Sequence, residues 1–181
     1  VRDMEIVDLE LQVRDLDLVQ RKIERLEKMA KSGDKEIKRQ VEVLKTLADH
    51  LENFGNVRDF EMDENDRKKI LDDLFLLTDK PVMYVCNVDD DSAVSGNKYS
   101  DAVKKALKDT GDKVIVVAGR LESEIAELED EDDRNEFLDD AGLTEPGVNR
   151  MIRSAYKLLN LESFFTAGPK EVRAWTVKKG S

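Results

Sequence analysis

A short polar turn follows a continuously apolar stretch of the chain, residues 82–86, and its side chains could bind a ligand. Asn87 carries an amide that donates and accepts hydrogen bonds, whereas Asp89 and Asp90 carry carboxylates that accept them. Such groups suit recognition of a planar polar ring. The same residue types are common in turns that only close a buried strand, and the turn by itself does not separate the two interpretations.

The flanking elements predict where this turn lies. The apolar run after Pro81 shows no alternation, which predicts a strand covered on both faces, as in a parallel sheet. A helical pattern over about 98–109 and a second apolar run at 113–119 complete a parallel strand–helix–strand unit. Ligands bind beyond the carboxyl ends of such strands, so we expect both strand ends to form one site.

The residues at the two strand ends could recognise a purine. Asp90 could accept hydrogen bonds from N1 and N2 of guanine, backbone carbonyls could accept from N6 of adenine, and Val88 could pack against the base. An Asn-x-x-Asp match alone is common by chance, and the second strand strengthens it. The candidates for a nucleotide-base site are Asn87, Val88, Asp90, Ala118, Gly119 and Arg120.

No set of catalytic or metal-binding residues is visible. The sequence lacks the G-x-x-x-x-G-K-[ST] loop that holds β- and γ-phosphates, and it shows no Ser/His/Asp or Cys/His set. Cys86 is expected to be buried, and His50 to be structural, because no second His or Cys stands near it. A single cysteine favours a reducing compartment, and no apolar run approaches the length of a membrane span.

Residues 16–57 are predicted to form an antiparallel helical hairpin, a coiled-coil arm. Apolar residues recur at alternating intervals of three and four over 16–30 and again over 37–51, which is typical of two helices packed along one stripe. Gly33 is expected to form the turn and Asp34 to cap the return helix. Residues 1–15 fit neither period cleanly and are interpreted as a lead-in, helical or extended.

The far half of this hairpin, residues 21–45, carries nine basic and five acidic residues in a chain of net charge −11. A basic tip could bind phosphate backbones, or the charges could form a solvated helix face with i,i+4 pairs. The candidates for RNA or partner binding are Arg21, Arg25, Lys28, Lys31, Lys35 and Lys38. The acidic excess comes mainly from residues 122–140, interpreted as a solvated face, and no reading of DNA sequence is expected.

The remaining segments predict further helices and a final pair of strands. A helix is expected over about 63–77, capped by Asp63, with Phe75 and Leu77 among its apolar residues. Another begins near Pro146, and residues 164–177 read as strand, turn and strand. Because two strands alone are only marginally stable, and because the first residue is not Met, we expect the chain to begin and end inside a larger protein.

The sequence resembles the Obg-like ATPase family, the YchF branch of the P-loop GTPase class, in order along essentially its whole length. The most specific part is F-F-T-A-G-P-K-E-V-R-A-W-T at 164–176. Support comes from K-P-x-x-Y-x-x-N-V at 80–88, E-x-E-I-x-E-L at 122–128, and the arm at 16–51.

This resemblance implies an α/β fold. It would contain part of a P-loop GTPase-like parallel sheet, an inserted antiparallel coiled-coil hairpin and the first strands of a β-grasp-like TGS domain. The implied domains are a lead-in from the G-domain at 1–15, the arm at 16–57, the C-terminal half of the G-domain at 58–163 and the start of a TGS domain at 164–181.

The resemblance also implies a nucleoside-triphosphate hydrolase, with ATP preferred and GTP possible, that depends on Mg²⁺, is cytoplasmic and associates with ribosomes. Asn87 and Val88 would contact the base, and 118–120 would be the last nucleotide loop. The family usually has Glu where this chain has Asp90, and GTPases have N-K-x-D, so this chain lacks their Lys but keeps their Asp.

The family's phosphate loop, switches and catalytic elements would lie before Val1, so this chain alone is expected to be inactive, with the Mg²⁺ ligands outside it. His50 does not match the family's catalytic His. The alternative function is a non-catalytic ribosome- or RNA-binding adaptor that acts through the basic arm.

Overall fold

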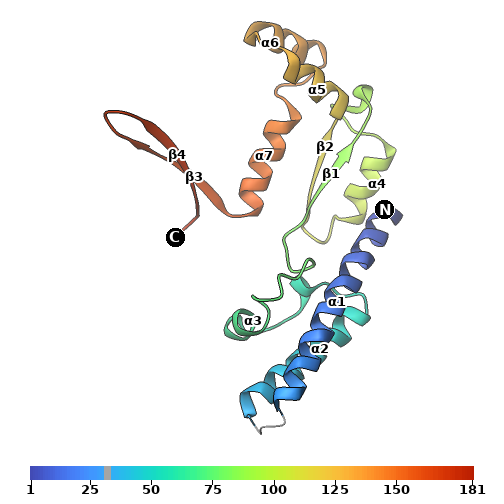
Figure 1. Ribbon diagram of the computed structural model, residues 1–181. Helices are drawn as coiled ribbons and strands as arrows, with labels where there is room; N and C mark the ends of the chain where they lie inside the picture. Colours follow the sequence, from blue (N-terminus) through green and yellow to red (C-terminus); the bar gives the residue numbers. More distant parts are fainter. Residues whose placement is uncertain (31–33) are drawn as a thin grey trace. The chain divides into compact units, whose positions relative to one another are not determined.

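The computed structural model describes residues 1–30 and 34–181, which divide into two compact units, Val1–Pro81 and Val82–Ser181 (Figure 1). The first unit is helical, and the second combines helices with two small sheets. The boundary between the two units falls after residue 81, whereas the sequence predicted that the helical arm ends at residue 57. The four domains implied by the resemblance remain predictions.

Two long helices form the first unit. Helices α1 (Arg2–Ala30) and α2 (Lys35–Glu52) lie side by side and run in opposite directions (Figure 1), and α1 begins well before residue 16, where the arm was predicted to start. Both helices contribute apolar residues to one core, in which Val19 and Leu44 are fully buried. The chain after α2 adds four buried residues to it, Val57, Ile70, Leu71 and Leu76. Asp34 caps α2 by accepting from the backbone of Glu36, as predicted. The predicted turn at Gly33 lies outside the described residues.

The lead-in predicted at 1–15 is the first half of helix α1. The apolar pattern fails there because both residues that α1 buries within 1–15 are polar, Gln12 and Asp15. Gln12 Nε2 donates to the carbonyl of Phe54 at 3.1 Å and to Asn56 at 2.9 Å, so it packs against the chain that leaves α2. A buried polar residue with partners far along the sequence leaves no periodic signal.

Helix α3 (Glu64–Ile70) begins at the predicted cap, Asp63, but ends well before residue 77. The ammonium of Lys22 donates to the carbonyl of Ile70 at 2.7 Å and to Asp73 at 2.5 Å, which satisfies the carbonyl where the helix stops. Phe75 then has a positive φ of 50° and is 75% exposed, so its expected place on an apolar helix face is wrong.

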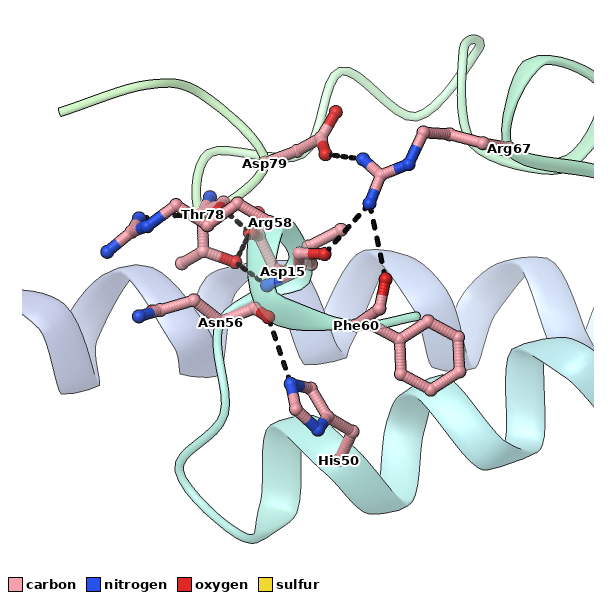
Figure 2. A network of polar contacts seen from close by, with 9 residues as sticks. Asp15, His50, Asn56, Arg58, Phe60, Arg67, Thr78 and Asp79 are labelled. Carbon is pink, nitrogen blue, oxygen red and sulfur yellow. Dashed lines mark hydrogen bonds and ion pairs between the residues drawn. The ribbon is translucent and has the colours of Figure 1, made fainter. Parts of the chain in front are cut away.

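A polar network fastens the hairpin to the segment that precedes the second unit (Figure 2). The fully buried carboxylate of Asp15 accepts from the backbone N–H of Leu77 and from both the N–H and the hydroxyl of Thr78, each at 2.7 Å. Arg67 pairs with Asp79 and donates to the carbonyl of Val57, which belongs to the 3₁₀ turn η1 (Val57–Asp59). We call Asp15, Val57, Arg67, Thr78 and Asp79 the root network.

Strand β1 (Met83–Asn87), helix α4 (Lys98–Ala106) and strand β2 (Lys113–Val117) form the predicted parallel strand–helix–strand unit (Figure 1). The 3₁₀ turn η2 (Asp90–Ser92) follows β1. The expectation that β1 is covered on both faces is wrong for the described residues, since none of its five residues is fully buried and Val85 is 42% exposed. The physical reason is that the helices packed on this pair, α4 and a later helix, α7 (Gly147–Leu158), lie mainly against β2.

Helices α5 (Gly119–Glu127), α6 (Glu131–Asp140) and α7 (Gly147–Leu158) follow β2. A small core under the end of β2 contains Ala118, Leu121, Ile125 and Leu138. Strands β3 (Leu161–Ala167) and β4 (Val172–Lys178) then form an antiparallel pair, as the sequence predicted, and Trp175 donates to the Thr166 hydroxyl at 2.8 Å. No helix in the described residues combines the length and apolar character needed to cross a membrane.

Candidate functional site

The register of the parallel pair brings the two predicted strand ends together. Asn87, the last residue of β1, lies opposite Val117, the last residue of β2. The backbone N–H of Val88 donates to the carbonyl of Val117 at 2.9 Å, which extends the pairing one step beyond the strands. The chain therefore leaves both strands at one edge, as expected for a parallel unit.

The side chain of Asn87 bridges these two ends. Its Oδ1 accepts from the backbone N–H of Gly119 at 2.9 Å, across 32 positions of sequence. A Cβ on Gly119 would lie 3.1 Å from this oxygen, so the close approach favours glycine here. Asn87 is exposed, and with Oδ1 accepting from Gly119 the donors of this side chain are those of its NH₂ group.

A second pair of predicted residues also meets at this edge. Arg120, on the first turn of α5, places Nη2 2.5 Å from Oδ2 of Asp90, and its Nε lies 3.6 Å from Glu124 one turn further along the helix. The Asp90 side chain is 29% exposed and that of Arg120 is 76% exposed. The carboxylate is thus partly enclosed, whereas the guanidinium lies on the surface.

The two apolar residues of the predicted site, Ala118 and Val88, pack into a small core next to the strand ends. Ala118 is 2% exposed and starts helix α5 as its N-terminal cap residue. Val88 is partly buried against the core that contains Ala118 and Leu121. Packing into this core holds the backbone beside Asn87 and Gly119, and Val88 stays partly exposed.

Glu122 holds the start of helix α7, and no role was predicted for it. Its carboxylate accepts from the backbone N–H of Gly147 at 2.6 Å and of Val148 at 3.1 Å, so it caps helix α7 from helix α5. The capping residue is 25 positions away from the helix it caps. The only sequence signal is that Pro146, at the α7 N-terminus, has no side chain able to cap it.

The predicted basic residues fall into two groups. Arg21 pairs with Asp17 at 2.8 Å and Arg25 lies 3.6 Å from Asp73, so both have acidic neighbours. Within the described part of the chain, no acidic side chain forms an ion pair with the three exposed lysines Lys28, Lys35 and Lys38. Lys31 lies outside the described residues. Lys22, counted with the basic tip, is buried in the root of the hairpin.

His50 has a structural role, as expected. Its Nε2 lies 2.9 Å from the carbonyl oxygen of Asn56, and its ring packs against Phe60 at 5.4 Å between centroids (Figure 2). No group of three or more His, Cys, Asp or Glu side chains within residues 1–30 and 34–181 is arranged to hold a metal ion. Cys86 is half-buried rather than fully buried, because β1 is only partly covered.

The resolved pKa shifts lie away from the strand ends, beside an open cavity of about 1360 Å³ along β2 and α7. A hydrogen bond from Arg153 lowers the pKa of Glu145, and the same pair raises the pKa of Arg153. Hydrogen bonds with Thr176 and then Ser163 lower the pKa of Tyr156. None of the six predicted base-site residues lines this cavity.

Comparisons with known proteins agree along almost the whole chain. The ribosome-binding ATPase YchF of Haemophilus ducreyi is 46% identical over 179 residues, which are 99% of this chain and 48% of that protein. The protein of that name from Escherichia coli is 44% identical over the same coverage. Obg-like ATPase 1 of Rattus norvegicus is 34% identical over 186 residues, 100% of this chain and 46% of that protein. No family model matches.

A solved structure, that of the Schizosaccharomyces pombe YchF GTPase, covers 99% of this chain and 49% of that one with a TM-score of 0.86 and 27% identity. The chain therefore spans about half the length of the relatives that it matches. The names of these four proteins specify different nucleotides: the yeast protein is called a GTPase, and the other three are called ATPases.

Proposed function

This chain belongs to the family of YchF and Obg-like ATPases, and on that basis we propose that it supplies the purine-base site of a nucleotide-hydrolysing switch that acts at the ribosome. The bacterial relatives are named ribosome-binding ATPases. A ribosomal role places the protein in the cytoplasm. In this proposal the strand ends bind the base, and the helical hairpin contacts the partner.

The observation that carries the proposal is the bridge from Asn87 to Gly119. It joins the carboxyl ends of two neighbouring parallel strands, where α/β proteins bind ligands, and it turns an amide donor outward. A purine presents ring nitrogens such as N7 that accept from an amide of this kind. The partly buried Val88 offers an apolar surface beside the same edge.

The described residues fit a base but do not by themselves fit a triphosphate. Within this sequence we find no glycine-rich loop with a lysine to hold β- and γ-phosphates. We propose that hydrolysis, the phosphate contacts and the Mg²⁺ ligands belong to other residues of the intact protein. When bound there, Mg²⁺ would neutralise charge on the phosphates. This chain would hold and orient the base.

Removing the Asn87 amide from the intact protein tests the proposal. Asn87→Ala should weaken binding of both ATP and GTP by about tenfold or more, measured by displacement of a fluorescent nucleotide, because both purines lose the donor and the bridge is broken. Asn135→Ala, an exposed asparagine of helix α6, is the matched control and should leave affinity unchanged. Equal affinities for the two variants would overturn the base-site proposal.

One observation favours a second candidate, a ribosome- or RNA-binding adaptor. Lys28, Lys35 and Lys38 project from the hairpin without acidic partners in the described structure, and unpaired exposed cations are the groups that bind phosphate backbones. The two functions are compatible in one protein. The adaptor alone would be the better description if the intact protein bound ribosomes but neither ATP nor GTP.

A further inference from the structure

We propose that the outer edge of strand β2 is a docking site for an acidic, extended segment of a partner protein, which adds to the sheet as a further strand. The inference is independent of the base site and concerns the edge of β2 that does not pair with β1. The open cavity of about 1360 Å³ along β2 and α7 is lined by Val114, Ile115 and Val116, so it follows the strand.

The first observation is that this edge carries unpaired backbone groups. The carbonyl of Val117 accepts from Val88, so Val117 faces β1, and in a parallel pair the residues alternate between facing the neighbour and facing away. Val114 and Val116 therefore face outward. In agreement, the carbonyl of Val116 accepts from Nη2 of Arg150 on α7 at 3.2 Å. Within the described residues, the N–H groups of Val114 and Val116 have no hydrogen-bond partner.

The second observation is the charge around the cavity. One acidic side chain lines it, Glu145, against five basic ones, which are Lys104, Lys113, Arg150, Arg153 and Lys157. Arg153 pairs with Glu145, and Lys104 lies 3.2 Å from Asp101. Among residues 1–30 and 34–181, no acidic side chain forms an ion pair with the other three cations. In a chain of net charge −11, this local excess of positive charge favours an acidic partner.

The backbone groups and the charges together favour a peptide. An extended peptide brings its own row of N–H and C=O groups to a strand edge, and its alternate side chains enter the pockets beside that edge. Val94, Ile152 and Leu161 give the same cavity apolar surface, so a segment that alternates acidic and apolar residues matches it. An RNA backbone could pair with the cations, but it lacks the regular donors and acceptors of a strand.

The test uses a fluorescein-labelled peptide of about eight residues that alternates Glu and Val, which is within the usual length of a strand. Fluorescence anisotropy measures its binding to the intact protein, and we expect saturable binding. A peptide of the same sequence with N-methyl groups on alternate residues should bind roughly tenfold more weakly, because methylation removes the main-chain donors. This comparison changes the probe alone, so it does not depend on the folding of a variant.

Charge reversal on the protein tests the choice of an acidic partner. Lys113→Glu combined with Lys157→Glu should weaken peptide binding by roughly tenfold or more, because two attractive charges become repulsive. The matched control is Lys105→Glu combined with Lys108→Glu, which changes the net charge equally at exposed lysines outside the cavity lining. The control variant should bind the peptide as the unmodified protein does.

Hydrogen exchange of the intact protein locates the contact. The amides of Val114 and Val116 should exchange faster than that of Val117 in the free protein and should slow by roughly tenfold or more when the peptide is bound. Protection of both amides in the free protein would overturn the inference, because the edge would already be covered. Equal binding of the N-methylated peptide would also overturn it. Binding of an oligouridine RNA that the Lys113 and Lys157 reversals abolish, without any binding of the peptide, would assign the cavity to nucleic acid instead.

Discussion

The side chain of Asn87 accepts a hydrogen bond from the backbone N–H of Gly119 at 2.9 Å, and this contact joins the ends of strands β1 and β2. One residue thereby performs two tasks. Its oxygen joins the chain after β2 to the end of β1, and in the proposed base site its NH₂ donates to the purine. Four further features of the structure lead to measurable predictions.

Loss of the Asp15 carboxylate should destabilise the helical hairpin strongly. Asp15→Ala leaves the backbone N–H of Leu77 and both donors of Thr78 without their acceptor, and Thr78 is 1% exposed. Unsatisfied buried donors of this kind cost about 3 kcal/mol in total. Urea denaturation followed by circular dichroism measures the change.

Asp17→Ala is the matched control for this experiment. Asp17 lies two residues further along α1 and makes a surface ion pair with Arg21, so its removal should cost less than about 0.5 kcal/mol. A similar midpoint for the two variants would show that the root network does not hold the hairpin in place.

Removal of the Glu122 carboxylate should loosen the start of helix α7. In Glu122→Ala the amides of Gly147 and Val148 lose their acceptor, which should cost about 1 kcal/mol and accelerate their hydrogen exchange. Glu127→Ala, at an exposed position of the same helix α5, should leave both exchange rates unchanged. Protection that persists in Glu122→Ala would contradict the proposed cap.

Neutralising the unpaired lysines of the hairpin should weaken ribosome or RNA binding in a salt-dependent way. Replacing Lys28, Lys35 and Lys38 with Gln should reduce the slope of log affinity against log salt by roughly 2 to 3, if each lysine contacts a phosphate. The control replaces three exposed lysines of the second unit, Lys105, Lys108 and Lys178. Equal slopes for both triple variants would exclude the hairpin tip as the phosphate contact.

The carboxyl of Glu145 should titrate below its usual value of 4.5, because the guanidinium of Arg153 donates to it and lowers its pKa. A pKa lower in the folded than in the unfolded state stabilises the fold above the unfolded value, and this contribution is lost as pH falls through the folded pKa. NMR titration of the Glu145 side chain should give a lowered midpoint that returns toward 4.5 in Arg153→Ala. The same midpoint with and without Arg153 would refute the pairing.

The features that local sequence predicted are those whose causes lie within a few residues. Asp34 and Asp63 were recognised as caps because a cap bonds to the next turn of its own helix. The parallel pairing of β1 with β2 followed from two apolar runs separated by a helix, and that pairing brought Asn87 to Gly119. Here the chain's order alone determines which ends meet.

The features that sequence missed depend on contacts across many residues. The sequence suggested that Lys22 is one of the exposed basic residues near the tip of the hairpin. In the structure its ammonium donates to the carbonyl of Ile70, the last residue of α3, and to Asp73, about fifty positions away. The sequence suggested that Glu122 is one of many acidic residues on a solvated face, because its partner, the start of helix α7, lies 25 positions away. The exposure of β1 was missed because burial of a strand depends on which elements pack on its faces, and helices α4 and α7 lie mainly against β2.

The most direct test of the base site is an NMR titration of the isotope-labelled intact protein with ATP. The account predicts that the backbone amide of Gly119 and the side-chain amide of Asn87 shift with a midpoint equal to the dissociation constant of ATP. The amide of Gly111, in the same unit but before the first residue of β2 and thus at the opposite end of that strand, should remain unchanged. Saturable ATP binding that leaves the Gly119 and Asn87 signals unmoved would contradict the account.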